Sequence, residues 1–144
     1  MIILDPLAQF QKANDTKKKS DFSQIQKALE AYYQDFGKYP LSSTAAPLYR
    51  ITVPGNPTSV TIDWGSPWRP YMNLLPKDPT MAKNYVYYSA GQSYWLYASL
   101  DRGSKDPQAC AGGQCSAPLG SNIDMTSACG GVCNFGVSSP NVSP

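Results

Sequence analysis

The hydrophobic pattern of the first 37 residues predicts one long helix. Five apolar side chains follow one another at spacings of 3, 4, 3 and 4: Phe22, Ile25, Leu29, Tyr32 and Phe36. This spacing places them on one helical face, where we expect them to form core contacts. Asp5-Pro6 is a typical helix start, because the aspartate caps and the proline needs no hydrogen-bond acceptor. Gly37 is typical of the position just after a helix end. We therefore predict a helix in residues 1–37.

The N-terminal half of this helix lacks a continuous apolar face. Leu7 and Phe10 are followed by the polar segment "QKANDTKKKSD", residues 11–21. Such turns lie in solvent or contact a partner that the monomer lacks. The run Lys17, Lys18, Lys19 is too short to bind DNA firmly by itself. A solvated helix face, paired with nearby acids or with acids of another subunit, is the favoured interpretation.

The pattern changes from helical to extended further along the chain. Residues 38–84 are rich in proline and form a connecting region with one or two short strands or turns of helix. In residues 85–100, two aromatic and β-branched runs joined by Ala90-Gly91-Gln92 predict a β-hairpin. Leu96 and Ala98 alternate on one face of its second strand, which we expect to cover the helix stripe. Residues 1–144 thus form one α+β domain, a long helix on a small antiparallel sheet.

The last segment, residues 101–144, is a Cys-rich loop tail with few large apolar residues. Its four cysteines are Cys110, Cys115, Cys129 and Cys133. Their even number and Gly-rich surroundings favour two disulfides and an oxidising compartment, with three pairings open. A zinc ion on four thiolates is the alternative, although the spacings C-x4-C and C-x3-C are not the usual ones. A dithiol redox enzyme is disfavoured because neither pair is C-x-x-C.

Composition argues against catalysis. The chain has no histidine and a net charge of only +2, which excludes His-dependent nucleophilic and zinc chemistry and gives no general attraction to nucleic acid. Asp101, Asp106 and Asp124 offer oxygen ligands to calcium, but turn formation is the favoured role because no D-x-D-x-D run concentrates them. We expect no cofactor, with calcium at these aspartates as the alternative.

The tyrosines and tryptophan of the hairpin raise one further alternative. They are Tyr85, Tyr87, Tyr88, Tyr94, Trp95 and Tyr97. Exposed aromatic rings can stack on bases or sugars. More often one face of such a sheet is core and the other is covered, and we favour that interpretation.

Several motifs, in order, resemble those of bacterial type IV pilins and of the related type II secretion pseudopilins. The segment "LDPLAQFQKANDTKKKSDFSQIQKALEAYYQDFGKYP" is similar to the part of a pilin that follows its membrane helix. "WRPYMNLLPKDP", then "YVYY" and "YWLYASLD", resembles the major pseudopilin pattern. The resemblance covers roughly residues 4–101. The tail departs from it, because four cysteines stand where the secretion family has a calcium loop, and this departure favours a pilin.

The resemblance implies a filament subunit that polymerises and is displayed at the cell surface. An apolar helix ahead of the present segment, with residues 1–4 as its end, would hold the precursor in the cytoplasmic membrane until the assembly machinery takes it up. Leu7, Phe10 and Lys17 to Lys19 would then contact neighbouring subunits. On this basis Lys18→Glu should impair assembly and leave the fold intact, whereas Leu29→Asp should unfold the domain. A major secretion pseudopilin and a minor pilin that binds DNA or an adhesion target are the alternatives.

Overall fold

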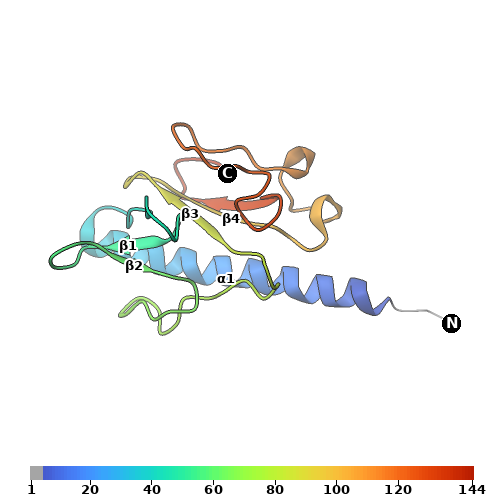
Figure 1. The fold of residues 1–144 in the computed structure, drawn as a ribbon, viewed down its shortest axis with the longest axis horizontal. Coiled ribbons are helices and arrows are strands. Elements are labelled where there is room, and N and C mark those ends of the chain that lie inside the picture. Colours follow the sequence, from blue (N-terminus) through green and yellow to red (C-terminus); the bar gives the residue numbers. More distant parts are fainter. Residues whose placement is uncertain (1–4) are drawn as a thin grey trace.

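A computed structural model describes residues 5–144, and the predicted end of the membrane helix, residues 1–4, lies outside this range. Helix α1, Pro6–Phe36, spans one side of the molecule (Figure 1). It begins as predicted: the Asp5 carboxylate accepts a hydrogen bond of 3.0 Å from the Leu7 N–H. It ends at Gly37, whose φ of 70° is left-handed, and whose N–H donates to the Tyr33 carbonyl.

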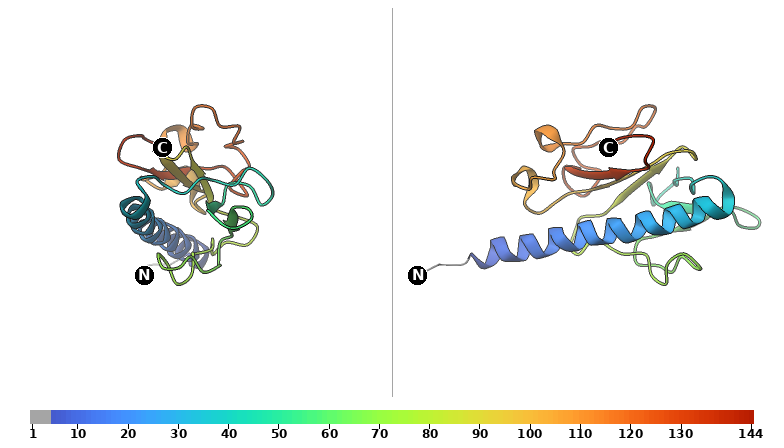
Figure 2. Two further views of the ribbon diagram at one scale, coloured as in Figure 1. Left: turned by 90° about the vertical axis from the view of Figure 1, so that its left-hand side faces the viewer. Right: turned by 180° about the vertical axis from the view of Figure 1, so that it is seen from behind.

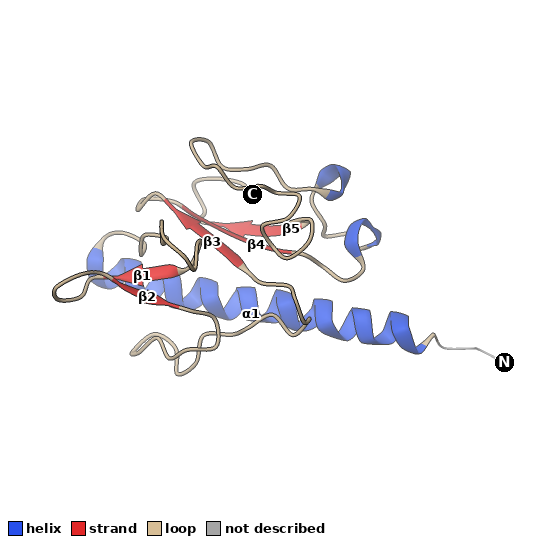
Figure 3. Ribbon diagram, viewed as in Figure 1, coloured by secondary structure: helices blue, strands red, loops and turns tan. Residues whose placement is uncertain are grey.

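The main sheet has three antiparallel strands in the order β3-β4-β5 (Figure 3). Strands β3, Val86–Ser89, and β4, Tyr94–Ala98, form the predicted hairpin. Strand β5, Phe135–Ser138, comes from the tail, which was expected to contain only loops. Gly136 lies opposite Tyr97, and a Cβ there would approach the Tyr97 ring to 2.9 Å. A glycine therefore fits this strand position, although it weakens the strand signal in the sequence.

The connecting region carries a second, smaller sheet. Strands β1, Ile51–Val53, and β2, Val60–Ile62, form an antiparallel pair beside the C-terminal half of α1 (Figure 1). Two 3-10 turns, η1 at Gly103–Lys105 and η2 at Ala111–Gly113, follow β4. Both sheets are short, and the rest of the chain packs around the long helix.

The main core lies between α1 and the inner face of the sheet. The helix contributes Phe22, Ile25, Leu29 and Tyr32, and strand β4 contributes Leu96 and Ala98; none of these is more than 3% exposed. Phe36 differs from the prediction, because it is 57% exposed. It is the last helical residue, and the rings that cover this end of the stripe, Trp68 and Tyr71, pack on Tyr32 instead.

The tail covers the outer face of the sheet, opposite α1 (Figure 2). A second apolar cluster forms there from Val86 and Tyr97 of the sheet with Ile123, Met125 and the buried cysteines of the tail. Each cysteine pairs with its neighbour in sequence, Cys110 with Cys115 and Cys129 with Cys133. The sheet is therefore enclosed by the helix on one side and by a cross-linked tail on the other.

Candidate functional site

The polar segment of α1 forms an internal charged cluster. The Lys18 side chain is fully buried, and its Nζ donates to the Ser99 carbonyl at 2.8 Å and to Asp101 Oδ1 at 3.0 Å. Asp78 Oδ1 lies 3.4 Å from the same ammonium group. Lys83 Nζ also reaches Asp101, at 3.2 Å. We call the side chains of Asp15, Lys18, Asp78, Lys83 and Asp101 the polar seam.

Asp101 is the centre of the polar seam. Burial opposes its charged form, but hydrogen bonds from Asn14, Lys18 and Thr80 outweigh that cost and hold the pKa of Asp101 well below its usual range. Asp78 differs because burial raises its pKa, despite contacts with Lys18 and the Thr80 N–H. Its Oδ2 is buried and accepts no hydrogen bond within residues 5–144. Lys18 is therefore the main counter-charge of two carboxylates.

Further contacts join the same helix segment to the strand ends. The Asp15 carboxylate accepts hydrogen bonds from the backbone N–H groups of Asp101 and Arg102, at 2.6 and 3.0 Å. Asp21 accepts from the Tyr85 hydroxyl at 2.7 Å, and hydrogen bonding to this carboxylate adds to burial in raising the pKa of Tyr85. Hydrogen bonds and ion pairs thus add to the apolar core contacts that hold the helix and the end of β4 together.

The predicted contact surface at Lys17, Lys18 and Lys19 is therefore wrong for Lys18, which is buried within its own chain. Lys19 pairs with Asp106 at 2.7 Å, and only Lys17, paired with Asp21 at 2.8 Å, has a side chain about half exposed. A sequence signal for this does exist, since Lys18 lies four residues before Phe22 and so continues the buried face. The lysine run is not a free basic patch for DNA.

The three candidate calcium ligands do not converge. Asp101 belongs to the polar seam, Asp106 binds Lys19 and the Gln108 N–H, and Asp124 accepts from Thr126 and Ser127 in its own turn. Within residues 5–144 no group of three His, Cys, Asp or Glu side chains is arranged to hold a metal ion. The four cysteines are all in disulfides, so the arrangement has no thiolates for the zinc alternative.

The hairpin aromatics do not form an exposed stacking platform. Tyr85, Tyr87, Tyr94 and Tyr97 are at most 1% exposed. Tyr88 and Trp95 face the tail cluster, and Trp95 Nε1 donates to the Ser143 carbonyl. These rings serve the core and its covering tail.

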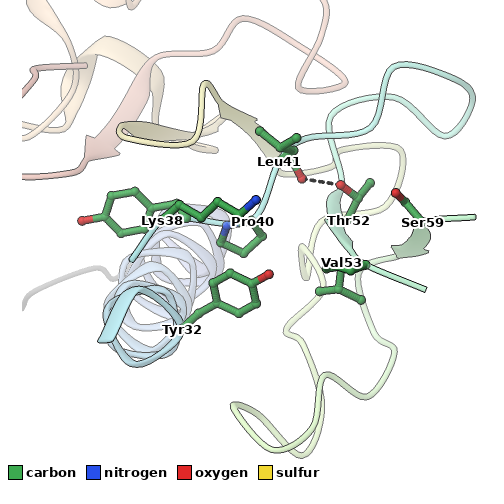
Figure 4. A pocket seen from close by; sticks show the side chains of 9 residues that line it. Tyr32, Lys38, Pro40, Leu41, Thr52, Val53 and Ser59 are labelled. Carbon is green, nitrogen blue, oxygen red and sulfur yellow. Dashed lines mark hydrogen bonds between the residues drawn. The ribbon is translucent and has the colours of Figure 1, made fainter. Parts of the chain in front are cut away.

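A small, partly open pocket lies between the end of α1 and strand β1 (Figure 4). Tyr32, Lys38, Pro40 and Val53 line it, and the Thr52 hydroxyl donates to the Leu41 carbonyl at its rim. Its volume is about 60 Å³, which accommodates only a few water molecules. It is too small for a substrate.

Two uncovered apolar surfaces lie at opposite ends of α1. Leu7 and Phe10 are 64% and 70% exposed at the N-terminal end. A groove of about 560 Å³ lies at the C-terminal end. We call it the apolar groove, and its lining residues are Tyr32, Phe36, Val53, Pro54, Val60, Ile62, Pro67, Trp68, Arg69, Pro70 and Tyr71. The part of the chain that the structure describes therefore offers apolar contact surfaces at both ends of α1.

Comparison with known protein families decides the relationship. The sequence model of the type II secretion system protein G family matches residues 6–114, more than half of the chain. The chain belongs to this family. Protein G is the major pseudopilin, a structural subunit, so the resemblance to pilins and pseudopilins is confirmed. A search of curated proteins finds no match, and neither does a search of solved structures.

The family match covers helix α1, strands β1 to β4 and Cys110 of the first disulfide. It ends before Cys115, so most of the cross-linked tail lies outside it. The sequence-based preference for a pilin over a secretion pseudopilin depends on the cysteines of this tail. Within residues 5–144 no helix has both the length and the apolar composition required to cross a bilayer.

Proposed function

We propose that the protein is the repeating structural subunit of a secretion pseudopilus and performs no chemistry of its own. The observation that carries the proposal is the protein G family match across the helix and the hairpin. Two structural features support it: the polar seam fixes a rigid head on α1, and the first helical turns present uncovered apolar side chains. A subunit that polymerises needs a rigid head and an uncovered surface that contacts its neighbours.

In this proposal an apolar helix ahead of the present segment holds the precursor in the cytoplasmic membrane. Assembly then removes the subunit from the membrane and places that helix in the filament centre, where apolar side chains are covered again. The head remains on the outside, with its disulfides in an oxidising compartment. Its partners are other pilin-like subunits and the assembly machinery.

Deletion of the gene in the source cells tests this function against the type IV pilus alternative. Two quantities are measured after deletion and after re-expression: the proteins released into the medium, and the pili on the cell surface. The proposal predicts that release falls and pili remain. Loss of pili with normal release would instead support the pilus alternative, and normal values of both would contradict a filament role.

A further inference from the structure

Two apolar surfaces at opposite ends of α1 are largely uncovered within residues 5–144. Leu7 and Phe10 are three residues apart and so share a helical face. In the apolar groove, Phe36 and Val60 are 57% and 53% exposed. Single exposed apolar side chains are ordinary, but a groove of about 560 Å³ lined by aromatic and proline residues is typical of a binding surface.

We propose that the apolar groove of one copy binds the first helical turns of a second copy through Leu7 and Phe10. The proposal rests on the filament function, because it names a contact between successive subunits. The groove then binds a leucine and a phenylalanine side chain from one face of a neighbouring helix.

The proposed filament requires a head-to-tail contact. A two-fold axis would make the two helices antiparallel and put each helix start into the other copy's groove, which closes the pair and stops growth. In a head-to-tail contact the helices are parallel and only one groove of the pair is filled. This contact leaves one free groove and one free helix start on every pair, so addition of further copies can continue without limit.

Charge complementarity supports the same pairing. Arg69 lines the groove, is exposed, and makes no salt bridge within residues 5–144. Asp5 is exposed beside Leu7, and only one of its carboxylate oxygens accepts a hydrogen bond from the described residues. A guanidinium group at the groove and a carboxylate at the helix start attract each other and favour the helix start as the occupant of the groove.

The geometry of α1 sets the spacing of the two copies. Phe10 and Phe36 are 26 residues apart in one helix, which corresponds to about 39 Å at about 1.5 Å per residue. Parallel copies in this contact are therefore offset by about 39 Å along α1. The first turns of α1 project from the rest of the chain (Figure 2), and Leu7 and Phe10 lie beside Thr80 and Lys83 of the head.

Photo-crosslinking in assembled filaments tests the contact. The full-length protein carries a benzophenone side chain in place of Phe10, which keeps an aromatic ring there, or in place of Leu119 as a control. Leu119 is 99% exposed and lies outside the groove. We expect the position-10 probe to label residues 53–71 of a second copy and the position-119 probe to label other positions. Labelling of another protein, of lipid, or of a different surface from position 10 would overturn the proposal.

A charge placed in the groove gives an independent result. Val60→Asp should lower the melting temperature by no more than about 4 °C, because Val60 is half exposed although aspartate is unfavourable in a strand. It should reduce filament yield at least about tenfold. Leu119→Asp should assemble normally. Normal assembly of the Val60→Asp protein would refute the contact while leaving the filament function intact. Absence of filaments from the unaltered protein would refute the filament function itself.

Discussion

The burial of Lys18 makes its replacement the most informative single change. Lys18→Met keeps the length of the side chain and removes the ammonium group that faces Asp78 and Asp101 at 3.4 and 3.0 Å. Removing one partner of a buried ion pair costs about 3–5 kcal/mol, because the remaining charge stays buried without compensation. Lys18→Glu adds a third buried carboxylate and should cost more. We therefore expect Lys18→Glu to unfold the domain, contrary to the sequence-based prediction.

Thermal unfolding of the 144-residue chain, followed by circular dichroism, measures this cost. A domain of this size loses about 2–4 °C in Tm per kcal/mol, so Lys18→Met should melt about 6–20 °C below the unaltered protein. Lys12→Glu is the matched control, since Lys12 lies on an exposed part of the same helix. It should change the free energy of unfolding by no more than about 0.5 kcal/mol.

A second substitution separates the charge effect from loss of packing. Asp78→Asn in the Lys18→Met background removes the carboxylate that loses its salt bridge, whereas Asp101 keeps its contact with Lys83. The double variant should therefore be more stable than Lys18→Met alone. Equal melting temperatures for Lys18→Glu and Lys12→Glu would refute the burial of Lys18, and with it the polar seam.

Three further predictions concern the core, the acid response and the tail. Leu29→Ala should lower the free energy of unfolding by about 2–5 kcal/mol in urea titrations, because Leu29 is fully buried. Leu74→Ala, at a side chain 59% exposed, should have little effect. Equal losses for the two variants would contradict the core assignment. The pKa of Asp101 is lowered in the folded state, so its stabilising effect is present above about pH 4 and is lost as the pH falls further. Asp101→Asn should accordingly be less stable at pH 7 and lose less stability than the unaltered protein between pH 5 and 2, and an unchanged pH profile would contradict this. Joint replacement of Cys129 and Cys133 by alanine should cost about 2 kcal/mol in urea titrations under oxidising conditions, and no loss there would show that the cross-link does not stabilise the tail.

Local signals in the sequence were sufficient for the helix and the hairpin. The Asp5 cap, the Gly37 end and the stripe from Phe22 to Tyr32 depend on residues a few positions apart, and the structure shows each of them. The same spacing rule failed at Phe36, because periodicity does not tell where the covering layer ends.

The polar seam depends on distant partners. Asp78 and Asp101 lie 60 and 83 positions beyond Lys18, so no local pattern predicts the ion pairs. The helical spacing does indicate that Asp15 and Lys18 are buried, because both continue the apolar stripe on the N-terminal side of Phe22. From the sequence alone, charged residues at these helical positions predict a contact surface, because burial of an unpaired charge is costly and only the fold supplies the counter-charges.

Strand β5 and the tail were the least predictable parts. The strand is four residues long and contains Gly136, which favours a loop assignment. It forms because β4 offers an unpaired edge and because Tyr97 fills the space that a larger side chain would need. The local pairing of the cysteines was one of three pairings that the sequence allowed.

Electron cryo-microscopy of filaments formed by the full-length protein tests the central claim most directly. The account predicts a helical filament in which every subunit is a copy of this chain, with the N-terminal end of α1 directed to the centre and the disulfide-linked tail at the outside. Full-length protein that stays monomeric in the presence of its assembly machinery, or filaments whose density contains a different chain throughout, would contradict it.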